Sequence, residues 1–212
     1  MVMGKLISIE GIEGAGKSTA LQFIRQYLTN ANIDVVCTRE PGGTDLAEKI
    51  RALILHSKDI EKVEPETELL MMFAGRLQHL KMKILPALNA GKWVVTDRFI
   101  DASYAYQGGG REIASTYITM LDQWIVGKTY PDLTLLMDIS PDEVIKRTEK
   151  RGTEKDRIEQ EKLDFFVRVR EAYLQRAKQD PKRIKIIDAS QSLHDVENQI
   201  RDELKNGLSL AT

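Results

Sequence analysis

A glycine-rich string near the N-terminus limits the possible folds more than any other part of the sequence. It runs from Gly11 to Ser18, reads Gly-Ile-Glu-Gly-Ala-Gly-Lys-Ser, and matches the pattern G-x-x-x-x-G-K-[ST]. A short apolar segment, 6–9, precedes it and is typical of a buried strand, and the segment 18–28 that follows carries apolar residues at helical spacing. A strand, a phosphate-binding loop and a helix in this order predict a nucleoside triphosphate site.

The residue types of this loop indicate what it can hold. Glycines let backbone N–H groups turn toward phosphate oxygens, and the N-terminus of the next helix adds its positive end. Lys17 is expected to reach the β- and γ-phosphates, and the Ser18 hydroxyl is expected to bind Mg²⁺. The residues predicted to bind ATP are Gly11, Ile12, Glu13, Gly14, Ala15, Gly16, Lys17, Ser18 and Thr19.

Short apolar segments alternate with helical patterns along the rest of the chain. Further strands are predicted at 33–38, 93–96, 133–138 and 184–187, and helices at 46–55, 65–89, 113–126, 157–178 and 193–204, with another opening at Pro141. Continuous apolar strands separated by helices are typical of a parallel sheet with helices on both faces. We therefore predict one α/β domain over 1–212, a three-layer phosphate-loop NTPase fold with a five-stranded, mostly parallel sheet.

Charge and cysteine content exclude several classes of protein. Lys and Arg total 31 and Asp and Glu total 32, so the chain lacks the basic excess of a general nucleic-acid-binding protein. The single cysteine, Cys37, cannot form an internal disulfide, and three scattered histidines do not suggest a zinc site. The sequence shows neither a long apolar run nor a signal peptide pattern, so we predict a cytoplasmic protein that binds no membrane.

The phosphate loop alone leaves the fate of the nucleotide open. The base-reading and switch motifs of a GTPase are absent, and a short chain without an appended module favours a small-molecule kinase over a motor or transporter ATPase. Arginines follow three predicted strands, at Arg39, at Arg98 and in the segment 147–157. Arginines at the carboxyl ends of strands favour an acceptor that already carries a phosphate.

Two alternatives stay open on this reasoning. One is another phosphate-loop kinase, acting on a nucleoside or nucleotide such as thymidine, dCMP or UMP. The other is a nucleotide-binding switch module without turnover, such as a partition-type ATPase, which would have no use for arginines around an acceptor.

Five motifs together resemble those of bacterial thymidylate kinases. They occur in the family's order at 10–18, 39–44, 97–103, 105–111 and 156–159, so the resemblance covers essentially the whole chain. The strings Arg-Glu-Pro-Gly-Gly-Thr and Ala-Tyr-Gln-Gly-Gly-Gly-Arg are the most specific. The resemblance implies transfer of the γ-phosphoryl group of ATP to dTMP, with Mg²⁺ as cofactor, by a homodimer.

The same resemblance implies roles for individual residues around the acceptor. Glu13 matches an acidic residue near the sugar 3′-hydroxyl and the metal, Arg76 an arginine that donates to thymine O4, and Tyr106 an aromatic side chain at the ribose 2′ position. Ser18 and Asp97 are the implied metal ligands, and the alternative role for Asp97, at the end of an apolar strand, is to orient an arginine. The full set implied to bind dTMP is Glu13, Arg39, Arg51, Met72, Phe73, Arg76, Arg98, Ser103, Tyr106 and Gln107.

The charged segment 147–158 resembles the family's lid, which closes over ATP. The loop between Gly11 and Gly16 holds no arginine, as in the subset of the family whose lid supplies the extra positive charge. Many members place a phenylalanine where this chain has Met72, so either Met72 or Phe73 is expected to cover the thymine. The residues implied in catalysis are Lys17, Arg98, Arg151, Arg157 and Glu13.

Overall fold

The computed structural model describes residues 3–55, 61–148 and 156–208 of the chain. Five strands form one sheet in the order β2-β3-β1-β4-β5, and all four neighbouring pairs are parallel. The strands are β1 (Leu6–Glu10), β2 (Val35–Arg39), β3 (Trp93–Asp97), β4 (Leu133–Asp138) and β5 (Ile184–Asp188). The predicted five-stranded parallel sheet is confirmed, and each strand lies within two residues of its predicted bounds.

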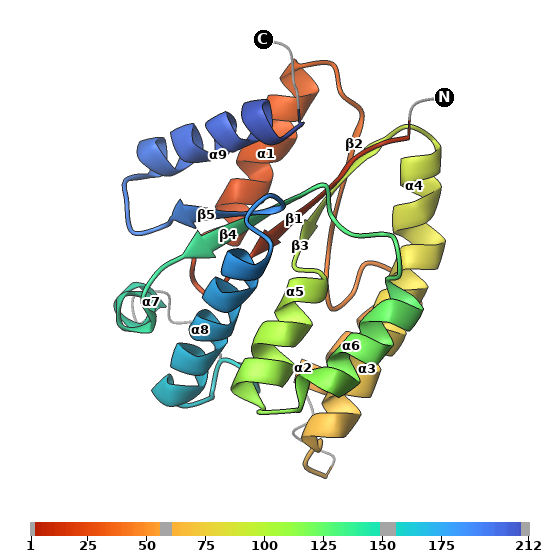
Figure 1. The fold of residues 1–212 in the computed structure, drawn as a ribbon, viewed down its shortest axis with the longest axis vertical. Helices are drawn as coiled ribbons and strands as arrows, with labels where there is room; N and C mark the ends of the chain where they lie inside the picture. Colours follow the sequence, from red (N-terminus) through yellow and green to blue (C-terminus); the bar gives the residue numbers. More distant parts are fainter. Residues whose placement is uncertain (1–2, 56–60, 149–155, 209–212) are drawn as a thin grey trace.

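Helices cover both faces of the sheet (Figure 1). On one face α1 (Lys17–Asn30) packs against α9 (Leu193–Leu208), and α8 (Leu163–Gln179) lies on the other face. The remaining helices are α2 (Asp45–Leu55), α3 (Pro65–His79), α4 (Leu85–Asn89), α5 (Ile100–Ser103), α6 (Ser115–Ile125) and α7 (Pro141–Thr148), with π-helical turns η1 (Leu80–Ile84) and η2 (Tyr104–Gly110). In the described ranges, no helix is both long and apolar enough to cross a bilayer.

Helix α1 shows how the sequence builds this packing. Ala20, Ile24 and Leu28 recur every four residues and are buried against the sheet and α9, while the positions between them are more exposed. Burying each of the two larger side chains contributes about 1.5–3 kcal/mol. The spacing of the apolar residues thus determines which face of α1 packs against the sheet. The phosphate loop is joined to the N-terminus of α1, so its position is determined as well.

The helical pattern predicted over 65–89 is continuous, but it contains the π-helical turn η1 directly before Pro86. Proline has no N–H, and its ring displaces the carbonyl one turn earlier, so a wider turn at this place accommodates it. The helix thus widens locally from Leu80 onward, before it reaches Pro86.

The glycines at 108–110 lie within η2, where α8 comes very close. A Cβ would lie 2.6 Å from Ala172 at Gly109 and 2.5 Å from the Phe165 ring at Gly110. The helix predicted from Arg157 starts only at Leu163, because the Asp156 carboxylate accepts the N–H groups of residues 158 and 159 and holds this segment as a turn.

The topology places three functional loops side by side. Strands β1, β3 and β2 are neighbours, so the loops that leave their carboxyl ends meet at one edge of the sheet. The phosphate loop follows β1, the Glu40–Pro41 turn with its cis peptide follows β2, and Arg98 follows β3. The carboxyl edge of a parallel sheet is where such folds bind their ligands.

Candidate active site

The phosphate loop leaves β1 at Glu10 and enters α1 at Lys17. Gly14 and Gly16 have φ angles of 77° and 90°, a left-handed conformation that favours glycine. The Lys17 Nζ donates to the carbonyl of Gly11 at 3.1 Å and to that of Ile12 at 2.8 Å, so its ammonium group lies over the loop. Burial, with a contribution from the nearby Arg98 charge, lowers the Lys17 pKa to about 8.

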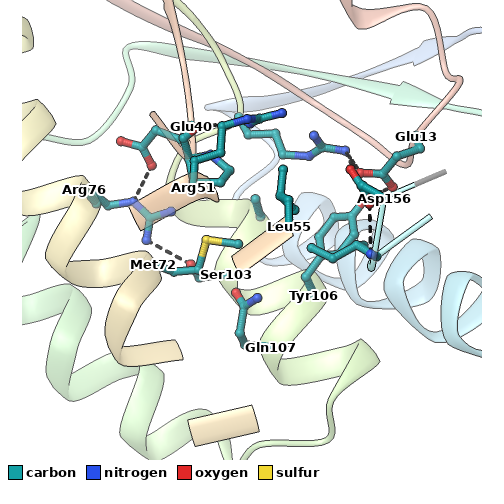
Figure 2. Close-up of a pocket in the computed structure, with 14 residues that line it drawn as sticks. Glu13, Glu40, Arg51, Leu55, Met72, Arg76, Ser103, Tyr106, Gln107 and Asp156 are labelled. Atoms are coloured by element: carbon teal, nitrogen blue, oxygen red, sulfur yellow. Dashed lines mark hydrogen bonds and ion pairs between the residues drawn. The ribbon is translucent and has the colours of Figure 1, made fainter. Parts of the chain in front are cut away.

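Glu13 connects the phosphate loop to β3 and η2. Its Oε1 accepts a hydrogen bond from Arg98 at 2.5 Å, and its Oε2 accepts one from the Tyr106 hydroxyl at 2.5 Å (Figure 2). Burial alone would raise the Glu13 pKa, but the charges of Arg98 and Lys17 outweigh it and lower that pKa. Glu13 is therefore a carboxylate at neutral pH, and it can accept hydrogen bonds or hold a cation.

Arg98 takes a left-handed backbone conformation, with a φ of 67°. This conformation is unfavourable for a residue with a side chain, and neighbouring groups hold it. The Arg98 N–H donates to the Ile9 carbonyl at 2.9 Å, and the next N–H, that of Phe99, donates to the buried Glu10 carboxylate at 2.8 Å. The turn after β3 thus aims the Arg98 guanidinium at the phosphate loop.

A cavity of about 540 Å³ opens beside Glu13 and Arg98 (Figure 2). Its wall combines charged, polar and apolar side chains from the loops after β1, β2 and β3 and from α2, α3, α5 and η2. The lining residues are Glu13, Glu40, Pro41, Arg51, Leu55, Met72, Arg76, Arg98, Ala102, Ser103, Tyr106, Gln107, Asp156 and Ile158.

Arg76 is the buried cation of this cavity, with 3% of its surface exposed. Its Nε donates to Glu40 at 2.7 Å, and its two terminal nitrogens donate to the Ser103 hydroxyl and the Phe99 carbonyl, each at 2.9 Å. The other oxygen of Glu40 lies 3.0 Å from Nδ1 of the buried His79. A guanidinium has five N–H donors, so donors remain for a ligand in the cavity.

The structure separates the two residues considered for covering a base. Met72 lines the cavity (Figure 2). Phe73 is only 1% exposed and lies in the core with Leu69 and Leu80, so it is not part of the cavity wall. The expectation for Phe73 is corrected here, because residues adjacent in a helix point about 100° apart and only one of them can face the cavity.

The predicted arginines take different positions. Arg51 and Arg98 line the cavity, and Arg51 also donates to the Pro41 carbonyl at 2.9 Å. Arg39 is exposed and pairs with Glu48 at 2.9 Å, outside the cavity wall. Arg157 forms an ion pair with Glu68 and donates to the Ile54 carbonyl at 2.8 Å, so it is directed to α3 and α2 and not to the phosphate loop. Arg151 and the lid residues 149–155 lie outside the described residues.

Two more cavities flank the phosphate loop. One, of about 960 Å³, contains Ser18, Arg39 and Asp97, and Oδ1 of Asp97 is buried there without a hydrogen-bond partner among the described residues. The other, of about 780 Å³, lies on the opposite side, between the loop and the start of α9, and includes Thr19 and Gln191. Within the described ranges, no three His, Cys, Asp or Glu side chains form a metal cluster.

Several site residues were missed by sequence reasoning. Glu40 and Asp156 belong to the motifs at 39–44 and 156–159, so a carboxylate within one of the motifs was a usable signal. Gln191 follows β5 at the same edge of the sheet, and its position after a strand was the only signal. Glu68 gave no signal in the sequence, because a glutamate in the first turn of a helix is usually exposed to solvent.

Comparison with known proteins gives a consistent result. The sequence model of a protein family, described as thymidylate kinase, matches residues 9–200 of this chain. A thymidylate kinase from Ruthia magnifica subsp. Calyptogena magnifica is 53% identical over 95% of this chain and 97% of its own length. One from Alkalilimnicola ehrlichii is 47% identical over 99% of this chain and 96% of its own length. The crystal structure of a thymidylate kinase from Ehrlichia chaffeensis superimposes with a TM-score of 0.76 at 32% identity, covering 96% of this chain and 99% of that one.

Proposed function

The chain belongs to the thymidylate kinase family, and from this premise we infer that it transfers the γ-phosphoryl group of ATP to dTMP, giving dTDP and ADP. The observation that carries this function is the cavity beside the phosphate loop. One end of it presents Arg98 and Glu13 next to the loop, and the other presents the buried Arg76 guanidinium. A nucleoside monophosphate has its phosphate and its base at opposite ends, as this cavity requires.

We propose that dTMP lies with its base toward Arg76 and its phosphate toward Arg51 and Arg98. Donors left on the Arg76 guanidinium would face thymine O4, and Ser103 and Gln107 would face the N3 edge. Met72 would cover the base, since its side chain lines the cavity and a thioether packs well against an aromatic ring. Tyr106, whose hydroxyl is fixed by Glu13, would lie at the sugar and leave little room for a 2′-hydroxyl.

We propose that ATP binds with its phosphates on residues 11–19. The buried Lys17 ammonium lies over the loop, and the N–H groups at the start of α1 point toward the same space. The cavity that contains Gln191 lies next to the loop and has room for the adenine base. This arrangement would put the two substrates on either side of Glu13.

Mg²⁺ fits the residues between these two sites. The Ser18 hydroxyl is exposed and the Asp97 carboxylate has a buried oxygen without a partner among the described residues, and both line one cavity. Mg²⁺ in kinases keeps several waters and uses only one or two carboxylates together with substrate phosphates, so a dense cluster of ligands is not required. We propose that Ser18 and Asp97 hold the ion, which neutralises phosphate charge when bound.

We propose Lys17, Arg98 and Glu13 as the catalytic residues in the described part of the chain. Lys17 and Arg98 would stabilise the charge that spreads over the transferred group, and Glu13 would hold Arg98 and Tyr106 in place. Arg151 remains a proposed lid arginine. For Arg157 to reach the phosphates from the proposed lid at 147–158, its ion pair with Glu68 would have to open.

We also propose a single domain, a cytoplasmic location and a homodimer. Helix α6 exposes Tyr117, Met120 and Trp124 at spacings of three and four, and Trp124 is 79% exposed. Helix α3, which packs beside α6, adds the exposed Leu70 (Figure 1). An apolar stripe of this kind is typical of a subunit interface. Light scattering should show a dimer for the wild type and a monomer for Trp124→Glu.

A panel of monophosphates with ATP and Mg²⁺ tests the function. We expect rapid ADP release with dTMP and a lower but detectable rate with dUMP. The two differ only in the 5-methyl group of the base, and a pocket for one methyl group contributes only about 1–3 kcal/mol. Discrimination against dCMP should be on the order of 10⁴, since its amino group would leave the Arg76 donors unpaired. Equal turnover of dCMP and dTMP would contradict the assignment of Arg76, and no transfer to any monophosphate would contradict kinase activity.

A further inference from the structure

Glu68 of helix α3 is a buried carboxylate directly behind the base end of the cavity. It is 1% exposed and is not among the residues that line the cavity. Its Oε1 accepts a hydrogen bond from the Gln107 side-chain amide at 2.8 Å. Arg111 lies 3.3 Å from its Oε2, and Arg157 pairs with the same oxygen.

These partners keep Glu68 ionised. Burial alone would raise the Glu68 pKa, but the Arg111 charge and the hydrogen bonds from Gln107 and Arg157 outweigh it and lower that pKa. An ionised carboxylate can only accept hydrogen bonds. Whatever Gln107 presents to Glu68 must therefore be its NH₂ group.

This contact determines which end of the Gln107 amide faces the cavity. An amide carries a donor at one end and an acceptor at the other, and a free side chain can turn either end to a ligand. With Nε2 held by Glu68, Oε1 is the end of the amide that is left to face a ligand. Figure 2 shows the oxygen directed toward the side of Ser103 and Met72, and no described residue donates a hydrogen bond to it.

The fixed orientation matches one class of pyrimidine. Thymine and uracil carry a hydrogen on N3 and can donate to Oε1, whereas N3 of cytosine is an acceptor and would face another acceptor. Position 4 of the base would face Arg76, whose guanidinium supplies only donors and therefore suits the O4 acceptor of thymine. The cavity thus presents donors at Arg76 and an acceptor at Gln107, the complement of the O4 and N3–H groups of thymine.

We propose that Glu68 is a positioning residue for pyrimidine specificity, which fixes the Gln107 amide so that its oxygen faces N3 of the acceptor base. The proposal rests on the placement of the base in this cavity, as proposed above. Glu68 would act entirely through Gln107, since it does not line the cavity itself. The same carboxylate also pairs with Arg111 and Arg157, so a test has to separate specificity from stability.

The main test compares Glu68→Gln with the wild type on two substrates, dTMP and 5-methyl-dCMP. These differ at the O4 and N3 positions and share the methyl group and the sugar phosphate. A glutamine at position 68 can donate or accept, so Gln107 becomes free to turn its NH₂ toward N3 of cytosine. We expect the ratio of kcat/KM for dTMP to that for 5-methyl-dCMP to fall by about tenfold or more. A purely structural role would lower both values by the same factor and leave the ratio unchanged, which would overturn the proposal.

Two further variants sharpen this result. Glu66→Gln makes the same substitution at an exposed position of the same helix turn and should keep the wild-type ratio. In a Gln107→Leu background the side-chain amide that would face N3 is absent, so Glu68→Gln should no longer change the ratio of kcat/KM values. If the ratio still fell tenfold in that background, Glu68 would act by another route and the proposal would be wrong.

A measurement on the wild type covers the case in which Glu68→Gln does not fold. N3-methyl-dTMP keeps O4 and the 5-methyl group but has a methyl group in place of the N3 hydrogen, so it cannot donate to Oε1. Its kcat/KM should be at least about tenfold below that of dTMP, because the acceptor is left unpaired. Equal values would overturn the proposal. Absence of transfer to dTMP itself would instead contradict the proposed function, so the two failures are distinguishable.

Discussion

The donor and acceptor halves of this active site are built in different ways. The proposed donor half is centred on a single stretch of chain, Gly11 to Lys17, whose backbone groups and one lysine are expected to bind the phosphates. The acceptor half brings together side chains from the loops after β2 and β3 and from α2, α3, α5 and η2, and its central Arg76 is held by Glu40 and Ser103 from distant parts of the sequence. The first half depends on local sequence, and the second depends on the folded core.

This difference should separate the effects of substitutions. Changing Lys17 removes a charge from a loop whose backbone shape is set by glycines, so activity should fall with little loss of stability. Changing Glu40 leaves Arg76 buried without its partner, and an unpaired buried charge is strongly destabilising. Activity and stability should therefore be uncoupled in the donor half and coupled in the acceptor half.

The largest effect is expected for Lys17→Ala. Loss of the ammonium group that stabilises the transferred phosphoryl group should lower kcat by on the order of 10³. The dissociation constant for dTMP, measured by calorimetry without ATP, should stay within about twofold of the wild type if the halves are independent. Lys178→Ala, at an exposed position of α8, is the matched control and should keep full activity. A Lys17→Ala enzyme that kept wild-type turnover would refute the role of this residue.

Glu40→Gln should combine a stability loss with a binding loss. The ion pair between Glu40 and Arg76 is buried, so we expect the free energy of unfolding to fall by about 3 kcal/mol. The KM for dTMP should rise while that for ATP changes little. The exposed pair of Asp34 and Lys92 is the comparison, since Asp34→Asn should cost no more than about 1 kcal/mol. A Lys17→Ala denaturation midpoint as low as that of Glu40→Gln would break the distinction between the halves.

The same distinction explains what the sequence could predict. The strands and the phosphate loop follow from local patterns, because continuous apolar segments and glycines at required positive φ angles act within a few residues. The neighbours Met72 and Phe73 could not be told apart, since their positions depend on how α3 rotates against the core. The partners of Arg76 and the contacts of Glu68 required the tertiary structure. Arg157 was placed in a lid by resemblance, but in the structure it contacts Glu68, a partner 89 residues away.

Tyr106 lies where the two halves meet and should have an intermediate effect. Its hydroxyl donates to Glu13 and its ring packs on Tyr173, so it is held from both sides. Tyr106→Ala should reduce the preference for dTMP over the ribonucleotide by roughly tenfold, as expected for loss of a steric contact. Tyr106→Phe keeps the ring and should keep the preference. An unchanged ratio of kcat/KM values in Tyr106→Ala would show that another residue excludes the ribose.

The smallest effect should appear as a difference between two pH profiles. The Lys17 pKa is lowered to about 8, first by burial and then by Arg98, so in the free enzyme the ammonium loses its proton as the pH rises through 8. Since kcat/KM reports the free enzyme, kcat/KM for ATP should fall above pH 8 and be about tenfold lower at pH 9. Bound phosphates favour the charged form, so kcat/KM for dTMP at saturating ATP should stay level to higher pH. Lys17→Arg should flatten the ATP profile in any activity it retains, because arginine keeps its proton. If both profiles of the wild type fell together, the titrating group would belong to the acceptor half, and the separation between the halves would not hold.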